Sequence, residues 1–562
     1  MFQGISGQVR KNVCGNGFFK RPFSIEISKL IYRLTMETGG APLLAGVPPP
    51  RFGHRHRMLC ILAMCNLCLY LNRANISVAI TFMYVDECVA PDGASRPFVD
   101  QCAAITDSAT CAIASSGVAA GGAQHCAWQD YSTERSNVLA AFYWGYMLSQ
   151  IPAGWWASAV GGKRVLTAAV CVWSVATALT TPAAAWLPAL VVSRIVVGAA
   201  EGLNYPAQVV LNAQWVPEAE RSRAWSFVSS GESAGTVLAM LVCPFMAHTL
   251  GWGSIFWMSA LVGAVWLGVF VKYCSATPEE ALRSLDARAD QAEKVAAAAA
   301  GGAGGAGAGA RARARADALA AERAALDAEL RLIAADRGEL IPPAAVPWAA
   351  FCRNGPFRAL VCAHFCYNYG YYVVLSWLPQ YFKSMFGADY TDMGVYGMLP
   401  YIGLAVCSNT GGALADRLLV AHGWRLTSVR RLFNTVGFLS PALCFFCLRW
   451  VSPCADTSCG SFKVAVLLLT AGVGMGGLAF SGYWANFIDL SPRYSGHLMG
   501  ISNSVATIPG IAGNLITGQI LAGRENDWDL VFGLAAGIYV FGAAVFVLFA
   551  RAERQPFDGA DE

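Results

Sequence analysis

Long apolar segments separated by short polar ones run along most of the chain after residue 57. A helix needs about 20 mostly apolar residues to cross about 30 Å of hydrocarbon, where only a helix satisfies its own backbone groups. The pattern predicts twelve such helices. They cover residues 58–84, 137–160, 164–182, 186–213, 223–249, 253–274, 356–384, 392–414, 429–450, 463–487, 496–522 and 528–551. The sequence therefore predicts an all-α membrane protein with twelve transmembrane helices in two six-helix bundles.

The segment between the sixth and seventh predicted helices has a different pattern. Residues 295–310 are almost all Ala and Gly, which predicts a flexible tether. Residues 311–340 mix Arg, Asp and Glu with Ala and Leu at helical spacing, which predicts a solvated amphipathic helix. The expected organisation is a cytosolic N-terminal tail over 1–57, a six-helix bundle over 58–274, a cytosolic linker over 275–345, a second six-helix bundle over 346–551 and a cytosolic tail over 552–562.

The composition agrees with a chain that lies in lipid. Hydrophobic residues make up 56% and charged residues 14%, against about 45–50% and about 25% in ordinary globular proteins. The net charge of +4 is too small to indicate a nucleic-acid partner. The sequence contains no Walker loop, dinucleotide fingerprint or zinc-type spacing in a suitable context. We therefore expect no enzyme activity, no metal and no cofactor.

Basic residues indicate the orientation, because short cytoplasmic loops carry an excess of Lys and Arg. The predicted loops after even-numbered helices hold most of the loop Lys and Arg, and basic residues also precede the first helix. Both termini are therefore expected in the cytosol. Six cysteines lie in predicted loops on the opposite face: Cys88, Cys102, Cys111, Cys126, Cys454 and Cys459.

Those six cysteines are candidate disulfide partners, and disulfides persist in oxidising compartments. This distribution favours a plasma membrane or an endomembrane of the vacuolar or lysosomal type. The alternative is a plastid envelope in which the thiols are free. The basic stretch before residue 34 keeps that alternative open, because it has the charge of a transit peptide.

The strongest charged candidates inside the predicted spans are Arg73, Arg194, Glu201 and Glu232. Each costs about 2.5–3.5 kcal/mol at the bilayer centre, so it should face a cavity or a partner. Arg194 and Glu201 are seven residues apart, which places them on one helix face about 10.5 Å apart. An arginine in a cavity suits carboxylate or phosphate, and a buried glutamate can take up a proton. The alternative is a structural Arg194–Glu201 pair that locks helices together.

Weaker polar candidates share these spans. Asn75 lies two residues after Arg73, and Tyr367 with Asn368 lies near the start of the seventh span. We expect them to contribute to substrate binding, although any of them could instead hydrogen-bond between helices. His364 is a single histidine within the seventh predicted span, which is more typical of a packing residue than of a proton relay.

Several segments resemble the anion:cation symporter family of the major facilitator superfamily, which includes sialin, vesicular glutamate transporters, type I sodium/phosphate cotransporters and plant anion transporters. The resemblance covers both predicted bundles and is carried by residues 72–80, 142–152, 201–207, 215–223, 364–368, 377–379 and 486–503. The turns over 154–164 and 412–417 are similar to the loop signature of the superfamily, with Ser158 where an Asp is usual.

The resemblance implies a secondary-active carrier of organic anions or phosphate that works by alternating access and is driven by protons, sodium or membrane potential. It implies substrate contact for Arg73 and Arg194, and proton coupling for Glu201. We also expect the carrier to function as a monomer. Leu139 and Tyr367 stand where vesicular glutamate transporters have His and Arg, which weakens a glutamate assignment. Glu232 is unusual for the family and is a second candidate for ion coupling. An anion channel and a non-transporting sensor or scaffold remain the rival hypotheses.

Overall fold

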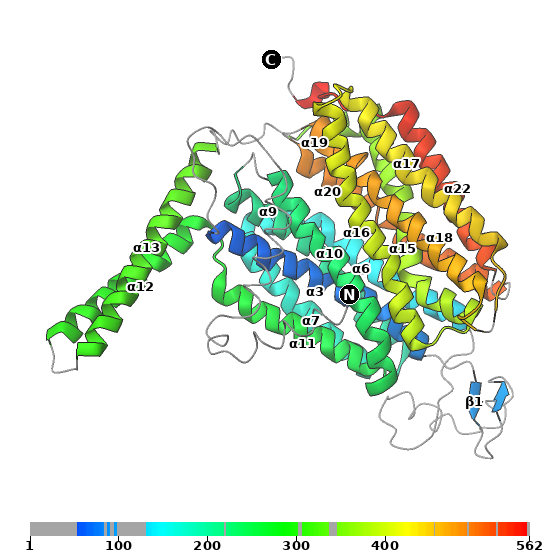
Figure 1. Ribbon diagram of the computed structural model, residues 1–562, viewed down its shortest axis with the longest axis horizontal. Coiled ribbons are helices and arrows are strands. Elements are labelled where there is room, and N and C mark those ends of the chain that lie inside the picture. Colours follow the sequence, from blue (N-terminus) through cyan, green and yellow to red (C-terminus); the bar gives the residue numbers. More distant parts are fainter. Residues whose placement is uncertain are drawn as a thin grey trace, which may run out of the picture. The chain divides into compact units, whose positions relative to one another are not determined.

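The computed structural model describes residues 53–83, 87–89, 95–97, 131–217, 221–301, 306–336, 346–454, 456–491, 494–523 and 527–558, and almost all of them are helical (Figure 1). The helices before the linker are α3 (His54–Met83), α6 (Tyr131–Val160), α7 (Gly162–Ala183), α8 (Leu187–Gly202), α9 (Asn204–Trp215), α10 (Arg221–Leu250) and α11 (Gly253–Tyr273). The linker forms α12 (Pro278–Gly301) and α13 (Ala306–Asp336).

The second half of the chain is helical as well. Its helices are α14 (Trp348–Arg353), α15 (Gly355–Phe386), α16 (Tyr390–Val420), α17 (Leu426–Cys447), α18 (Gly460–Gly476), α19 (Asn486–Leu490), α20 (Ser495–Val505), α21 (Ile508–Gly523) and α22 (Trp528–Phe549). Short 3-10 turns form at Leu448–Trp450, Gly477–Ser481 and Pro556–Asp558. The strands β1 (Glu87–Val89) and β2 (Ser95–Pro97) pair antiparallel.

The twelve predicted spans are confirmed. They correspond to α3, α6, α7, α8 with α9, α10, α11, α15, α16, α17, α18 with α19, α20 with α21, and α22. Nine of them, judged over the described residues, are long and apolar enough to cross a membrane. The other three, α6, α15 and α16, are 30, 32 and 31 residues long. That length exceeds the about 20 residues required, and their many tyrosines and glycines account for the lower apolarity.

The chain divides into two compact units. The larger unit comprises Met64–Gln214, Ser229–Ala281 and Glu339–Glu562, and it holds nearly all of the spanning helices. Within it, α6 packs against α8 and α7 against α11, while α16 packs against α18 and α17 against α22. A further contact joins α6 to α21, so the first and second halves of the chain meet inside this unit.

Glycines allow α6 and α8 to approach closely. A Cβ on Gly198 would lie 1.9 Å from the backbone oxygen of Phe142, and a Cβ on Gly145 would lie 1.9 Å from that of Ile195. Any larger side chain would force the helices apart. This close approach positions the Phe142 ring beside residues of α8, which is important for the site described below.

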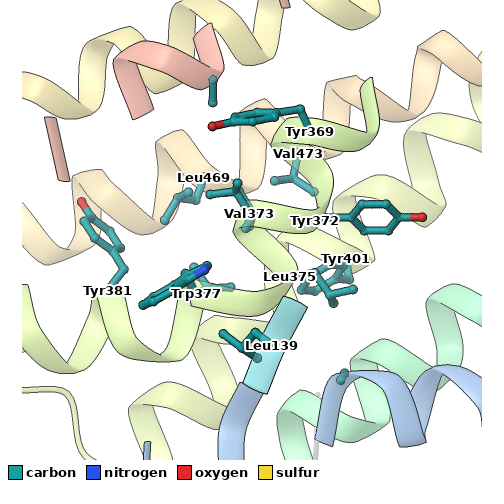
Figure 2. Packing of buried hydrophobic residues seen from close by; sticks show 14 of the residues in the cluster. Leu139, Tyr369, Tyr372, Val373, Leu375, Trp377, Tyr381, Tyr401, Leu469 and Val473 are labelled. Atoms are coloured by element: carbon teal, nitrogen blue, oxygen red, sulfur yellow. The ribbon is translucent and has the colours of Figure 1, made fainter. Parts of the chain in front are cut away.

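The interface between the two halves is packed with apolar side chains from α15. Val373 and Trp377 belong to a buried cluster that also includes Leu469 of α18 (Figure 2). Figure 2 shows Leu139 of α6 near Leu375 of α15. Both of these leucines line a small cavity between the halves.

The linker differs from the expectation in one respect. The prediction of a flexible Ala/Gly tether over 295–310 was wrong for 295–301 and 306–310, because α12 continues to Gly301 and α13 begins at Ala306; residues 302–305 lie outside the described part. Ala has the highest helix propensity, which explains why the Ala-rich stretch is helical. The predicted helix over 311–340 is confirmed as far as Asp336; residues 337–340 lie outside the described part.

The smaller unit contains this linker pair together with Met1–Ala63 and Trp215–Val228. Leu319, Leu326 and Ile333 of α13 are buried at seven-residue intervals, as are Leu285 and Ala292 of α12. Such spacing is typical of helices packed along a seam. Asp286 of α12 pairs with Arg323 of α13, so the two helices are also joined by charge.

Cys454 and Cys459, two of the predicted disulfide candidates, form a disulfide. Both lie in the segment that connects the 3-10 turn at Leu448–Trp450 to α18. Cys102, Cys111 and Cys126 lie outside the described residues. The same holds for the side chain of Cys88, whose backbone belongs to β1.

Candidate functional site

Arg73 of α3 lies inside the larger unit and pairs with Glu201 at the end of α8. Its Nε and Nη2 atoms donate to Glu201 Oε2 at 3.4 and 3.3 Å. These distances exceed the about 2.7–2.9 Å of a strong charge-assisted bond. The Arg73 guanidinium also lies within 5.1 Å of the ring centroids of Tyr70, Phe142 and Tyr146. The pair is therefore loose, and cation–π contacts supply part of the support for the Arg73 charge.

An amide network holds the Glu201 carboxylate from the other side. Asn72 Nδ2 donates to Glu201 Oε1 at 2.8 Å. Asn72 Oδ1 in turn accepts from Thr177 of α7 and from Asn75, while Asn75 also donates to Ser259 of α11. Asn75 thus acts on Glu201 through Asn72, and the structure places it behind the carboxylate.

Arg194 of α8 is fully buried and differs from Arg73 in its surroundings. None of its three guanidinium nitrogens has a hydrogen-bond partner among the residues that the structure describes. The guanidinium lies 5.6 Å from the ring centroid of Phe142, on the helix that Gly198 brings close. Glu201 forms its ion pair with Arg73, whereas Arg194 interacts with Glu201 electrostatically without a hydrogen bond among the described residues.

A small cavity joins the two arginines. It is lined by residues from α3, α6, α8 and α15, namely Arg73, Ile76, Ser77, Leu139, Phe142, Tyr143, Arg194, Leu375 and Ser376. The cavity has room for about one water molecule. Two guanidinium groups therefore face one small cavity between the halves, and no carboxylate is among its described lining residues.

Glu232 of α10 lies near the same arginine. Its carboxylate accepts hydrogen bonds from Tyr70, Tyr205 and Ser229. Arg73 Nη1 donates to the Tyr70 hydroxyl at 3.5 Å, and the Tyr205 and Tyr70 hydroxyl oxygens are 3.5 Å apart. The second carboxylate is thus connected to Arg73 through a tyrosine.

Tyr367 and Asn368 lie apart from this cavity. Tyr367 is surrounded by aromatic rings of the second half, including Phe438 and Tyr483. Asn368 donates to the backbone oxygen of Ala506 at 2.9 Å. His364 shares a 2.9 Å hydrogen bond with Ser502, as expected of a packing residue.

The sequence did not identify Arg135 of α6 as a charged residue inside a span. The predicted second span began at residue 137, which placed Arg135 in a loop, whereas α6 begins at Tyr131. Arg135 is fully buried, and its guanidinium lies 5.6 Å from the ring centroid of Trp377. A more generous N-terminal boundary for the span would have identified it.

Comparisons with known proteins identify relatives for most of the chain. A profile of the Major Facilitator Superfamily matches residues 62–514. The sodium-dependent phosphate transport protein 1, chloroplastic, of Arabidopsis thaliana is 32% identical over 418 residues, 74% of this chain and 72% of that protein. The ascorbate transporter, chloroplastic, of the same plant is 31% identical over 430 residues, 76% and 70% of the two chains.

Human sialin is 30% identical over 421 residues, which cover 74% of this chain and 75% of sialin. Among solved structures, the crystal structure of a D-xylose-proton symporter matches with a TM-score of 0.57 at 15% identity, over 88% of this chain and 98% of that one. The structural match shows the fold. Together with the sequence matches, it shows that this multi-pass membrane protein belongs to the major facilitator superfamily of secondary transporters, in the branch that contains these anion transporters and sialin.

Proposed function

We propose that this chain carries small organic anions or inorganic phosphate across a membrane, with the anion bound between Arg73 and Arg194. The observation that carries this proposal is the buried Arg194 guanidinium, which faces a cavity without a hydrogen-bond partner among the described residues. A charge at membrane depth costs about 2.5–3.5 kcal/mol, so a partner is expected. The planar guanidinium suits carboxylate or phosphate. Two relatives are named for phosphate and ascorbate, which belong to this class.

Glu201 is proposed as the coupling acid. An anion that enters the cavity competes with the Glu201 carboxylate for Arg73, whose bonds to Glu201 are 3.3–3.4 Å long. Once displaced, a buried carboxylate is more stable with a proton. Anion binding and proton binding therefore favour each other, which is the requirement for symport.

Glu232 is proposed as a second coupling group. Its connection to Arg73 through Tyr70 means that movement of the arginine toward an anion changes the hydrogen bonds of Glu232 as well. Tyr367 and Asn368 would reach the anion only after the halves rearrange, since neither lines the cavity in this structure.

A flux screen tests the substrate class. The purified protein is placed in vesicles and offered phosphate, glutamate, sialate, ascorbate and sugar acids, with proton and sodium gradients imposed separately. We expect saturable uptake of at least one of these anions, driven by the proton gradient. Uptake driven by sodium alone would overturn the proton assignment, and no uptake of any anion would overturn the function.

Two substitutions test the named roles on the anion that the screen identifies. Arg73→Ala should abolish uptake at normal membrane abundance, whereas Arg449→Ala, at an exposed arginine, should not. Glu201→Gln should keep anion exchange but lose accumulation driven by a pH gradient. Normal uptake by Arg73→Ala or gradient-driven accumulation by Glu201→Gln would contradict the scheme.

The rival hypotheses give different results in the same vesicles. A channel would show large currents without saturable exchange. A sensor or scaffold that uses α12 and α13 would lose its role when residues 278–336 are deleted, whereas a carrier should retain flux.

The proposed orientation has both termini in the cytosol and the Cys454–Cys459 disulfide on the opposite face. A disulfide there suits a lumen or the cell exterior, as at a plasma membrane or endomembrane. Two relatives are chloroplastic, so the plastid envelope is the alternative location. Fractionation of cells that express the tagged full-length chain distinguishes these membranes.

A further inference from the structure

One face of α9 carries a row of amide side chains that begins just after Glu201. Asn204, Gln208 and Asn212 are spaced four residues apart, which keeps them on one side of a helix. Asn204 and Gln208 are fully buried, and Asn212 is 7% exposed. At about 1.5 Å per residue, the row extends about 16 Å from Glu201 toward the end of α9. That end is the proposed cytosolic side.

The first part of the row is hydrogen-bonded to α3. Asn204 Nδ2 and Gln208 Nε2 donate to Asn66 Oδ1 at 3.2 and 2.8 Å. Cys65 donates its thiol to Asn204 Oδ1 at 3.4 Å and interacts electrostatically with Glu201. The amides are therefore continuous with the surroundings of the proposed coupling acid.

The second part of the row has unused hydrogen-bonding capacity. Gln208 Oε1 and both the Oδ1 and Nδ2 atoms of Asn212 have no hydrogen-bond partner among the described residues, and all three atoms are buried. A buried polar atom without a partner costs about 1–3 kcal/mol. Buried water is the usual partner of such atoms and makes about three hydrogen bonds. The positions of these atoms thus indicate where water would be held.

From this placement we infer that the Asn204–Gln208–Asn212 row holds a file of water molecules through which the proton of Glu201 reaches the proposed cytosolic face. The inference rests on the proposed function, because it requires Glu201 to be the coupling acid. The amides do not carry the proton themselves. They order the water, the Glu201 carboxylic acid gives its proton to the nearest water, and the proton passes along the file while the carboxylate returns to Arg73.

The titration of Glu201 depends on charged and titratable groups from several helices. These are Arg73 and Cys65 of α3, Tyr143 and Tyr146 of α6, and Arg194 of α8 itself. Tyr70 and Tyr205 act on Arg73. Gln208 and Asn212 are uncharged and lie seven and eleven residues after Glu201, about two and three helical turns along the chain. Their replacement should therefore change the rate of proton release and leave the equilibrium titration of Glu201 unchanged.

The test measures proton release from the full-length protein in phosphatidylcholine vesicles. A light-triggered pH jump is followed by infrared difference spectroscopy, and the carboxylic acid band of Glu201 is identified by its absence in Glu201→Gln. Gln208→Leu and Asn212→Leu should slow relaxation of this band at least about tenfold, with an unchanged midpoint pH. Asn212→Ser, which can still bind water, should relax nearly as fast as the natural protein. Val209→Leu serves as the matched control and should have no effect, because Val209 of α9 is 41% exposed.

Each outcome decides a different claim. Natural relaxation rates in both leucine variants would overturn the water path while Glu201 kept its role. If no band disappears in Glu201→Gln, the coupling role fails and the path fails with it. Gln208→Leu breaks bonds to Asn66 and Asn204 and could misfold. Asn212→Leu breaks no hydrogen bond among the described residues. If Gln208→Leu misfolds, the relaxation rate of Asn212→Leu therefore decides whether the water path exists.

Discussion

At the residue scale, Arg194 combines full burial, a permanent charge and unused hydrogen-bond donors. A buried charge without hydrogen-bond partners carries an uncompensated desolvation cost, and an apolar side chain of similar volume removes that cost. A substrate contact, by contrast, is lost on replacement. Stability and transport should therefore respond in opposite directions at this position.

The prediction is that Arg194→Met keeps or raises the thermal unfolding midpoint in detergent and lowers anion uptake at least about thirtyfold, since loss of a buried charged contact costs about 2–5 kcal/mol. Arg430→Met is the contrasting variant. Arg430 donates to both oxygens of Asp489 at 2.6 and 3.2 Å and to the Ser481 backbone. Its loss should destabilise the protein by about 3–5 kcal/mol. A structural role for Arg194 would make the two variants behave alike.

Single residues also show what the sequence can and cannot reveal. A charge inside an apolar run is costly wherever the helix lies, so Arg73, Arg194 and Glu201 were identifiable as candidate site residues. The ion pair between Arg73 and Glu201 depends on how α3 approaches α8, which the sequence does not reveal. The amide row was not singled out, because amides cost less than charges in lipid and the orphan atoms become visible only with burial known.

At the element scale, the approach of α6 to α8 positions the Phe142 ring between the two arginines. A Cβ on Gly198 would lie 1.9 Å from the Phe142 backbone oxygen, so Gly198→Val must separate the helices. Overpacking typically costs about 1–3 kcal/mol. We expect a lower unfolding midpoint and weaker anion binding. Gly268→Val, at a glycine with no heavy atom within 4 Å of its Cβ, is the control and should leave both measurements unchanged.

Periodicity predicted the spanning elements well because lipid imposes a length on them. No such length constraint applies to the linker. Its glycine content suggested a tether, and composition did not reveal that Leu285 and Leu319 are buried where the two linker helices pack together. The linker helix α13 also contacts α3 in the smaller unit. Glu322 accepts from Arg57, and Glu329 accepts from the Arg55 backbone N–H.

This contact should depend on pH. Burial raises the pKa of the Glu329 carboxyl above its ordinary value, and the Arg55 N–H and nearby arginines only partly oppose that effect. A carboxyl whose pKa is raised in the packed state favours packing when protonated, so the contact should strengthen as pH falls through that pKa and weaken above it. Burial lowers the pKa of His54 and lowers that of His56 to about 4 at the same contact, so their protonation opposes packing as pH falls. Hydrogen exchange of α13 amides near Leu326 therefore isolates the Glu329 contribution by comparison with Glu329→Gln at each pH. The natural protein should be less protected than Glu329→Gln at pH 8 and about equally protected at pH 5, and greater protection of the natural protein at pH 8 would contradict this assignment.

At the scale of the whole membrane unit, the two halves are held together at both ends. Gln150 of α6 accepts from Asn503 at 3.0 Å and donates to Thr507 at 3.3 Å. Lys383 of α15 donates to the backbone oxygen of Thr81 at 3.4 Å, near the other end of α3. The halves therefore share contacts at both ends, with a cavity for about one water between them.

Alternating access requires these two sets of contacts to break in turn, so weakening one set should shift the population toward the state open at that end. Gln150→Ala should lengthen the distance between spin labels at Lys163 and Arg417, on the proposed cytosolic side, and leave the distance between labels at Trp186 and Asp456 unchanged. Lys383→Ala should do the reverse. Because a hydrogen bond contributes only about 0.5–1.5 kcal/mol, each shift should be a change in population by roughly a factor of two to ten, not a complete conversion. If both label pairs moved together in either variant, the halves would be separating instead of rocking, and the assignment of the two contacts as opposite gates would fall.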